Sequence, residues 1–369
     1  MTEWLSGTLD VLCEVEYGTR VTRKRDGGTK YPVYGGGGAT FNLDDFNRED
    51  QMIVSRFAMS EECVRFVPGK FFLNDSGLTV RTRDESKMSQ EFLDQQLLAR
   101  SNEIYATARG TAQKNMDMTM FRNMELAIPD SLEEQKRIVA LLDAATARVT
   151  ELTACYEQAR THANNLFTSG LRAALESNPD WPVKTLGDIV CFESETARSE
   201  DLSSRDVYVG LENIASDGTL IGLGSVSAET LKSNKARFTD KHILFGKLRP
   251  YLVKVVRPDF PGVCSTDILP LEPTAELSRD FLYWYMRSPA VIERATEAST
   301  GTTLPRVSPT TLKSFEISVP PLEEQKKIVA RLDSMRAKTS EMATAYDAKL
   351  TAAKNLRQSI LESAFEGKL

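Results

Sequence analysis

Histidine is nearly missing from this chain, and its cysteines are few and scattered. Only two histidines occur in 369 residues, so histidine-based catalysis and metal binding are not expected. The cysteines are odd in number and never form a Cys-x-x-Cys pair, which argues against a zinc site and a disulfide framework. They predict a reducing compartment, the cytoplasm. The five are Cys13, Cys63, Cys155, Cys191 and Cys264.

Long apolar runs and catalytic signatures are also missing. No stretch of about 18 apolar residues occurs, so no membrane span is expected, and the N-terminus lacks the features of a signal peptide. No P-loop, Rossmann, zinc-protease or nucleophile-elbow motif occurs. No catalytic site, metal or cofactor is therefore predicted. Asp75, Glu85 and Lys87 have the rough spacing of a metal-dependent nuclease, which stays an alternative, as does a non-catalytic coiled-coil scaffold.

An internal repeat organises the chain. The phrase LEEQKRIVALLD begins at Leu132 and LEEQKKIVARLD begins at Leu322, with ten of twelve residues identical. Without gaps, the match extends over 132–176 and 322–366. The chain is therefore a tandem duplication in which a globular domain is followed by a helical arm. The expected segments are a first domain at 1–129, a first arm at 130–177, a second domain at 178–319 and a second arm at 320–369.

The domains show a mixture of strand and helix patterns. Segments such as DVYVGLENI and HILFGKLRPYLVKVV are rich in β-branched and aromatic residues and lie between turn residues. The segment MSQEFLDQQLLARSNEIYATAR has the spacing of an amphipathic helix. We therefore expect two mixed α/β domains and an α+β chain.

The arms have the heptad pattern of a coiled coil, sustained over about four heptads. Because the first arm ends at the second domain and the second arm runs back, an antiparallel pair is expected; two helices packed on separate cores are the alternative. The expected seam of the first arm is Ile138, Leu142, Ala145, Val149, Leu152, Tyr156, Ala159, Ala163 and Leu166. That of the second arm is Ile328, Leu332, Met335, Thr339, Met342, Tyr346, Lys349, Ala353, Leu356 and Ile360.

Positive charge is concentrated in one basic patch per domain, although the net charge is −6. Aromatic residues are interleaved with the basic ones, which suits contact with DNA phosphates followed by reading of bases in a groove. A solvated cationic face is the alternative. The candidates in the first domain are Arg20, Arg23, Lys24, Lys30 and Tyr34, and those in the second domain are Lys235, Arg237, Lys247, Arg249 and Tyr251.

The chain resembles the specificity subunits of type I restriction–modification systems over essentially its full length. The motifs that carry this resemblance are ILFGKLRPYL, GVCSTDILPLEP and GTTLPRVSPTTLKSFEISVPPLEEQKKIVARLD in the second half. The first half has YPVYGGGG and a looser version of the long motif. It lacks the TLPR found at Thr303 to Arg306, which makes its DNA-contact positions harder to assign.

The resemblance implies a non-catalytic, phage-defence subunit in which each domain is a target-recognition domain for one half of a split, asymmetric DNA sequence. The arms would form an antiparallel coiled coil that sets the spacer and docks two adenine-specific methyltransferase subunits. Restriction (motor) subunits would join that core, and S-adenosylmethionine and ATP would be bound by the partners.

The resemblance also implies site residues. It adds Arg109, Lys114, Thr302, Thr303 and Arg306 to the DNA-binding candidates. On the arms, the partner-binding candidates are Glu134, Gln135, Ile138, Glu324, Gln325 and Ile328.

Overall fold

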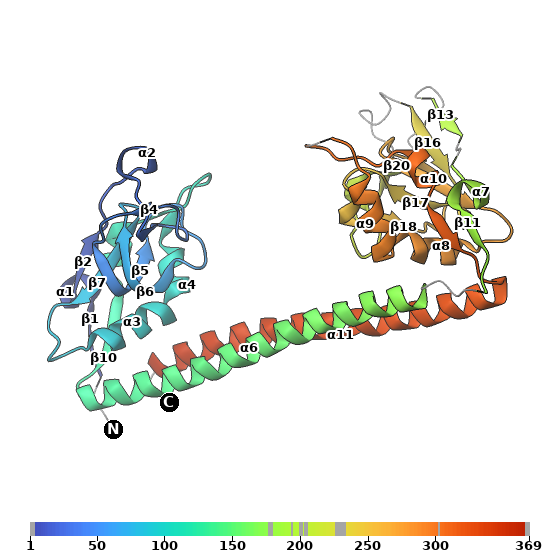
Figure 1. Cartoon of the computed structure of the whole chain (residues 1–369). Coiled ribbons are helices and arrows are strands. Elements are labelled where there is room, and N and C mark those ends of the chain that lie inside the picture. Colours follow the sequence, from blue (N-terminus) through green and yellow to red (C-terminus); the bar gives the residue numbers. More distant parts are fainter. Residues whose placement is uncertain are drawn as a thin grey trace. The chain divides into compact units, whose positions relative to one another are not determined.

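The computed structural model describes residues 4–175, 180–192, 195–198, 202, 206–225, 234–301 and 303–365. It divides into two compact units, of which unit 1 contains residues 1–157 and 348–369 and unit 2 contains residues 158–347. Each unit therefore combines one domain with part of each of two long helices (Figure 1). The long helices are α6 (Leu132–Ala174) and α11 (Leu322–Phe365).

The domain of unit 1 is built on a six-stranded sheet with the order β2-β7-β5-β6-β3-β4. A two-stranded ribbon of β1 and β10 returns the chain to the start of α6, with Trp4 opposite Pro129. The elements are β1 (Trp4–Thr8), α1 (Leu9–Leu12), β2 (Cys13–Tyr17), α2 (Arg23–Asp26), β3 (Tyr31–Tyr34), β4 (Asn42–Leu43), β5 (Arg48–Ser55), β6 (Val64–Leu73), β7 (Gly77–Thr82), α3 (Gln90–Ala99), α4 (Ser101–Ala106), β8 (Ala108–Arg109), β9 (Asn115–Met116), α5 (Met118–Arg122) and β10 (Glu125–Pro129).

The domain of unit 2 contains a four-stranded sheet, β12-β20-β17-β18, and a five-stranded sheet, β13-β16-β19-β14-β15. A ribbon of β11 and β21 again leads into a long helix. The elements are β11 (Val183–Thr185), α7 (Leu186–Ile189), β12 (Val190–Cys191), β13 (Thr196–Ala197), β14 (Val207–Val209), η2 (Leu211–Asn213), β15 (Gly224–Ser225), β16 (Lys235–Phe238), β17 (Ile243–Gly246), η4 (Pro250–Leu252), β18 (Val255–Val256), β19 (Gly262–Cys264), β20 (Ile268–Pro273), α8 (Arg279–Met286), α9 (Pro289–Glu297), α10 (Pro309–Lys313) and β21 (Glu316–Ser318).

The long helices run antiparallel within each unit. In unit 1, Ile138 near the start of α6 shares a buried cluster with Leu361 near the end of α11. In unit 2, Phe167 near the end of α6 shares a buried cluster with Leu332 near the start of α11. Both clusters extend into the neighbouring domain, so each domain core continues into the helix pair. The expected α+β duplication with paired long helices is confirmed. Within the described ranges, no helix combines the length and apolar character needed to cross a membrane.

The coiled-coil seam differs in part from the expected one. Val149 and Ala163 are buried, but Leu152 and Leu166 are 45% and 61% exposed. Phe167, one residue further on, is buried instead and lies against Trp284, with 5.5 Å between the ring centroids. Since successive residues of a helix are rotated by about 100°, taking Phe167 into the core turns its neighbour outward. The expected positions Tyr156, Ala159 and Ala163 stay covered, and the seam departs from the expected one at Leu152 and Leu166.

Helix α11 shows the same shift at the equivalent positions. Met342 and Leu356 correspond to Leu152 and Leu166 in the repeat, and they are 41% and 50% exposed. The side chain of Lys349, another expected seam residue, is exposed and lies over the ring of Tyr156 at 5.3 Å. Four apolar side chains that the pattern assigned to the seam therefore lie at the surface.

Candidate nucleic-acid interface and arm surface

Two loops of unit 2 that are far apart in sequence are joined into one surface. The first follows β17 and contains Lys247, Arg249 and Tyr251, and the second contains Gly301 and residues 303–306. The Arg249 N–H donates to the Pro305 carbonyl at 2.8 Å, and the Val307 N–H donates to the Lys247 carbonyl at 3.1 Å. The structure therefore brings together five of the predicted DNA-binding residues, Lys247, Arg249, Tyr251, Thr303 and Arg306.

The side chains on this surface are held by specific contacts. Arg306 donates from Nε and Nη2 to the two carboxylate oxygens of Asp267, at 3.0 and 3.3 Å. These hydrogen bonds raise the pKa of the Arg306 guanidinium. Among the described residues, the Nε of Arg249 is buried and has no hydrogen-bond partner. Tyr251, two residues after Arg249, is 50% exposed.

Unit 1 contains the same arrangement at the end of β5. The Met116 N–H donates to the Arg56 carbonyl at 2.8 Å, and the Met59 N–H donates to the Lys114 carbonyl at 2.9 Å. These bonds correspond to those that Lys247 and Arg249 make with Val307 and Pro305, although the donor Met59 is one residue further from its strand than Arg249. Lys114 therefore lies where the second domain has Pro305. The predicted Lys114 is exposed, and its Nζ lies 3.0 Å from the Tyr105 hydroxyl.

The two loop pairs also share an unusual backbone. Ala58 and Arg249 both have positive φ angles, +49° and +52°, and each is the third residue after its strand. Non-glycine residues in this left-handed region are uncommon, and they persist only where the surrounding structure holds them. The facing hairpins turn at Gly110 and Gly301, with φ of +115° and +99°. A strained turn at the same place in both domains indicates a built surface.

Arg56 is a candidate that the sequence pattern missed. It is the structural counterpart of Lys247, and its guanidinium lies over the rings of Tyr17 and Phe57 at 4.8 and 4.6 Å. The segments around the two residues, VSRFAM and FGKLRP, have no common motif apart from the basic residue. Only the shared hydrogen-bond pattern aligns them, so sequence reasoning had no strong signal to find Arg56.

The remaining DNA-binding candidates lie in several places. Arg20, Arg23, Lys24 and Lys30 are exposed on the segment around α2, which projects from the domain at the end away from α6 (Figure 1). Tyr34 is half-buried against Phe71, and Arg109 pairs with Asp117 at 2.9 Å. In unit 2, Lys235 is buried at 7% exposure, and Arg237 pairs with Glu195 at 3.5 Å. Thr302 lies outside the described residues.

Lys235 therefore differs from the expected surface contact. It lies on β16, where its neighbour Ala236 pairs with strands on both sides, and the residue is buried. Residues two apart on a strand share a face, so Lys235 and Arg237 lie on the same side of β16, and that side is covered enough to bury Lys235 and to half-bury Arg237.

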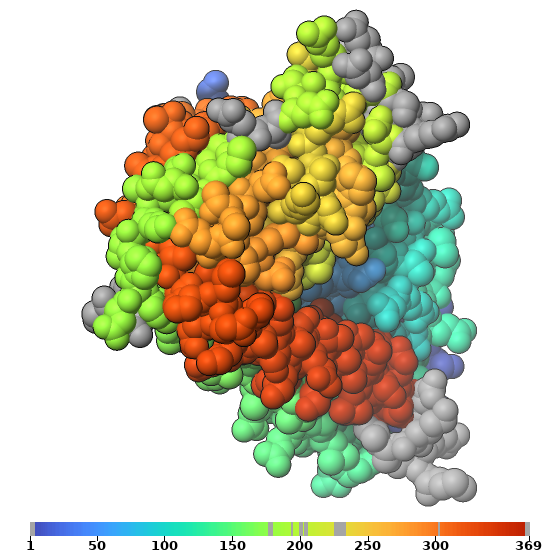
Figure 2. Space-filling model, turned by 90° about the vertical axis from the view of Figure 1, so that its right-hand side faces the viewer, coloured from blue at the N-terminus to red at the C-terminus, as the bar shows by residue number. Residues whose placement is uncertain are grey.

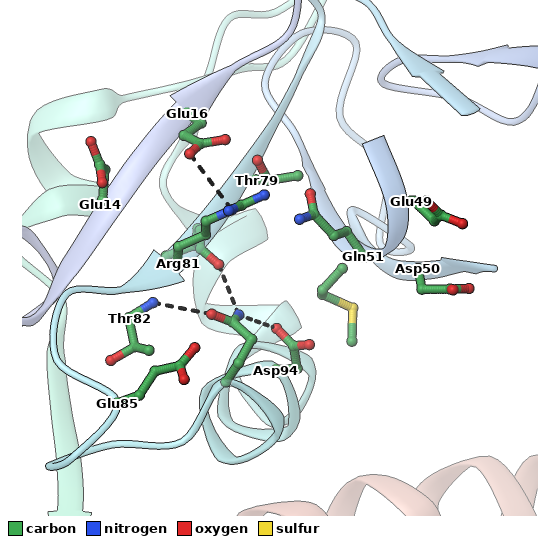
Figure 3. Close-up of a pocket in the computed structure, with 13 residues that line it drawn as sticks. Glu14, Glu16, Glu49, Asp50, Gln51, Thr79, Arg81, Thr82, Glu85 and Asp94 are labelled. Carbon is green, nitrogen blue, oxygen red and sulfur yellow. Dashed lines mark hydrogen bonds and ion pairs between the residues drawn. The ribbon is translucent and has the colours of Figure 1, made fainter. Parts of the chain in front are cut away.

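An acidic pocket lies on the side of unit 1 formed by β2, β7, β5 and α3. Figure 3 shows the carboxylates around it, with Arg81 directed at Glu16. The Arg81 Nε lies 3.6 Å from Glu16, and the Nε2 of Gln90 donates to Asp94 at 2.8 Å. A surface with this excess of negative charge repels phosphates. The six acidic residues that line it are Glu14, Glu16, Glu49, Asp50, Glu85 and Asp94.

The nuclease candidates are not gathered in this pocket. Glu85 lines it, but Asp75 and Lys87 do not, and the Lys87 ammonium pairs with Asp84 at 3.5 Å. In the part of the chain that the structure describes, no group of three or more histidine, cysteine or acidic side chains is arranged to hold a metal. Burial raises the pKa of the Cys13 and Cys264 thiols to about 12, so both stay protonated and unreactive near neutral pH.

Asp94 makes the stability of unit 1 depend on pH. Burial raises the pKa of this carboxyl from 3.8 to about 6. The folded state therefore binds the proton more tightly than the unfolded state, and the resulting stability is present below about pH 4 and lost as the pH rises through 6. At pH 7.5, Asp94→Asn is expected to raise the free energy of unfolding by on the order of 1–3 kcal/mol.

Urea unfolding at pH 4 and pH 7.5 measures this effect. The gain from Asp94→Asn should nearly vanish at pH 4, where the native carboxyl is already neutral. Glu14→Gln is the matched control, because Glu14 lies exposed at the same pocket. A gain of equal size at both pH values would contradict the assignment.

The predicted partner-binding residues at the start of the arms are mostly buried. Gln135 and Gln325 have no exposed surface, and Ile138 and Ile328 are 2% and 8% exposed. They differ from the expected surface contacts because each arm begins against its own domain core. Glu134 pairs with Arg137 at 2.7 Å and Glu324 pairs with Lys327 at 3.2 Å.

Exposed apolar side chains occur along both arms, at Leu141, Leu152, Leu166, Leu322, Met342 and Leu356, and four of them form two equivalent pairs in the repeat. Unit 1 presents Leu152 of α6 and Leu356 of α11, and unit 2 presents the repeat-equivalent Met342 of α11 and Leu166 of α6. Each unit thus carries one residue of the equivalent pair Leu152/Met342 and one residue of the equivalent pair Leu166/Leu356. Figure 2 shows the side chains of α11, in red, open at the surface of the molecule.

Comparison with known proteins assigns the family. The model of the type I restriction modification DNA specificity domain matches residues 1–159 and again residues 178–352. The chain belongs to this family, and the two matches correspond to its two halves.

Individual relatives agree with this assignment. The chain is similar to the type I restriction enzyme EcoDI specificity subunit of Escherichia coli, with 32% identity over 152 residues, or 41% of this chain and 34% of that subunit. It is 24% identical to the StySPI specificity subunit of Salmonella potsdam over 290 residues, or 73% of this chain and 62% of that subunit. The matched part of the chain thus spans about a third of the EcoDI subunit and under two thirds of the StySPI subunit.

Solved structures share the fold. A chain of a type I R-M system, described in connection with complex assembly and conformational transition, has a TM-score of 0.77 at 18% identity, covering 100% of both chains. The HsdS subunit from Thermoanaerobacter tengcongensis has a TM-score of 0.53 at 19% identity, covering 99% of this chain and 97% of that one.

Proposed function

We propose that this chain is the DNA-recognition subunit of a type I restriction–modification complex and has no catalytic activity of its own. Its domains, at 1–129 and 178–319, each read one half of a split, asymmetric sequence in double-stranded DNA. The observation that carries this proposal is the repeated loop pair, which presents basic and aromatic residues from a strained turn in both units. The scaffold is repeated while the side chains on it differ, as two different half-sites require.

The arms, at 130–177 and 320–369, serve two adenine-specific methyltransferase subunits, with restriction subunits joining in the complete complex. The repeat supports this proposal, because Leu152 and Met342, and likewise Leu166 and Leu356, are equivalent residues that stay exposed. Equivalent apolar surfaces suit two copies of the same partner. S-adenosylmethionine and ATP belong to the partners.

Methylome sequencing tests the proposal. A host that expresses this chain with its methyltransferase subunit should carry adenine methylation at a single split sequence with a fixed spacer. Replacing the second domain by that of a relative should change one half of the sequence and keep the other. Methylation that is unaffected by the exchange, or metal-dependent cleavage by the isolated chain that Lys87→Ala abolishes, would contradict the proposal.

Arg56 supplies a direct test of the interface in unit 1. Arg56→Gln is expected to weaken DNA binding by the assembled complex by about tenfold and to lower the slope of log K against log salt by about 1, as loss of one phosphate contact requires. Fluorescence anisotropy between 50 and 200 mM salt, an ordinary range for such titrations, measures both quantities.

Arg81→Gln is the matched control for that experiment. Arg81 is an arginine of the same unit, half-exposed at the acidic pocket, and its loss removes the same charge. If both variants weakened binding equally, the effect would come from net charge and not from the loop.

A further inference from the structure

Gln135 and Gln325 are buried amides that connect each arm to its domain. The Oε1 of Gln135 accepts from the Ser89 N–H at 2.9 Å, and its Nε2 donates to the carbonyls of Lys87 and Pro129 at 2.7 and 3.1 Å. Each amide therefore has an acceptor bond and two donor bonds. All three bonds recur for Gln325.

The side-chain amide of Gln325 makes the corresponding three hydrogen bonds in unit 2. Its Oε1 accepts from the Ser278 N–H at 2.7 Å, and its Nε2 donates to the carbonyls of Glu276 and Pro320 at 2.9 and 2.8 Å. Ser89 and Ser278 are the N-cap residues of α3 and α8. Two units with different loops and sheets thus attach their arms through one identical hydrogen-bond pattern.

A second contact follows two turns along each arm. Asp143 accepts from Gln95 Nε2 at 2.7 Å, and Asp333, its repeat equivalent, accepts from Trp284 Nε1 at 3.0 Å. Gln95 and Trp284 are the sixth residues of α3 and α8. In unit 2, Arg257 also donates to Asp333, at 2.8 Å.

The two contacts on each arm are eight residues apart, or about 12 Å along the helix. Within each unit, both contacts reach the same domain helix, which is α3 in unit 1 and α8 in unit 2. The apolar pairs Ile138/Leu142 and Ile328/Leu332 are buried between the two contacts. Apolar packing alone tolerates small slides and rotations. Buried amides do not, because a shift of one residue would leave a buried donor and two buried carbonyls without partners, which destabilises the shifted arrangement.

We propose that Gln135 with Asp143, and Gln325 with Asp333, are positioning residues that fix the rotation and tilt of each domain on its arm. They hold the DNA-reading loops of each unit at a set angle, so the complex accepts one spacer length between half-sites. This proposal rests on the proposed function and goes beyond it by assigning spacer selectivity to named side chains that touch no DNA.

The contacts of Gln135 and Asp143 in unit 1, and of Gln325 and Asp333 in unit 2, are called the clamp. The first test measures the clamp of unit 1 without DNA. Cys155 on α6 and a cysteine introduced at Asn102 on α4 are exposed positions of unit 1 for spin labels, in a full-length chain carrying Cys191→Ser. Double electron–electron resonance should give a narrow distance distribution for this chain. Gln135→Met, which keeps the volume and removes the hydrogen bonds, should broaden it, and Lys136→Ala, at an exposed neighbour, should not. An unchanged distribution in Gln135→Met overturns the proposal.

The second test measures spacer selectivity in the assembled methyltransferase complex. DNA substrates carry both half-sites with spacers from two base pairs shorter to two longer than the native one. Gln135→Met and the milder Asp143→Ala are expected to reduce the preference for the native spacer over its neighbours by about tenfold, with discrimination against mismatched bases unchanged. Asp143 is exposed, so Asp143→Ala is not expected to unfold the domain.

The outcomes separate the two proposals. Equal loss of methylation at all spacers would mean that the clamp is structural only, and it would overturn the positioning role. Failure of the unmodified complex to methylate any split target would instead contradict the proposed function, and the resonance measurement would then still decide whether the clamp exists.

Discussion

Trp284→Ala should lower the free energy of unfolding of unit 2 by about 3–5 kcal/mol. The indole is 2% exposed, lies against Phe167 of α6 and Tyr283, and donates to Asp333 of α11. One side chain therefore joins the second domain to both long helices. Removing it leaves a large cavity and an aspartate without its indole donor. Urea unfolding followed by near-ultraviolet circular dichroism measures the loss.

The repeat provides the control for this prediction. Gln95 occupies the same position of α3 in unit 1 and makes the corresponding bond to Asp143, but it is not an aromatic core residue. Gln95→Ala should cost no more than about 1 kcal/mol. Comparable losses from the two variants would show that the bond to aspartate, and not the buried indole, dominates the stability at this position.

A charge on the exposed apolar surface of the arms should abolish partner docking. Leu152→Asp in unit 1 is expected to weaken binding of one methyltransferase subunit by at least about 100-fold, because it removes a leucine contact and buries a carboxylate. The doubly substituted chain, with Leu152→Asp and Met342→Asp, should lose both subunits. Analytical ultracentrifugation of the mixed proteins reports the stoichiometry.

Ala154→Asp tests whether the effect belongs to that face. Ala154 is exposed and two residues further along α6, which places it on the opposite side of the helix. It should leave both the stoichiometry and the thermal stability unchanged. Two subunits bound to the double variant would place the docking surface elsewhere on the arms.

Much of this architecture is readable from the sequence because it depends on local periodicity and repetition. The phrase at Leu132 and Leu322 shows the duplication, and heptad spacing predicts long helices wherever apolar residues recur at helical intervals. The motif around Arg249 and Arg306 indicated the second-domain surface, and the structure joins its two loops. The family can also be recognised from the sequence motifs, without any knowledge of contacts between side chains.

Side-chain environment was decided by tertiary packing. Leu166 and Phe167 are both apolar and adjacent, and packing in the core of unit 2, including contact with Trp284, buries Phe167 and leaves Leu166 exposed. Gln135 has the composition of a surface residue, yet it is buried because three backbone groups of its domain satisfy its amide. Arg56 became a candidate only because its carbonyl accepts a hydrogen bond equivalent to the one that the Lys247 carbonyl accepts in unit 2.

The sequence by itself determined the duplication, the helical arms and the family, because these follow from residue types at fixed spacings along one chain. The tertiary structure alone decided which face of each arm is free, where the arms are attached and which basic residues share a surface. Those features depend on pairings between residues more than 40 positions apart, such as Gln135 with Lys87 and Arg249 with Pro305. No periodicity along the chain encodes such pairings.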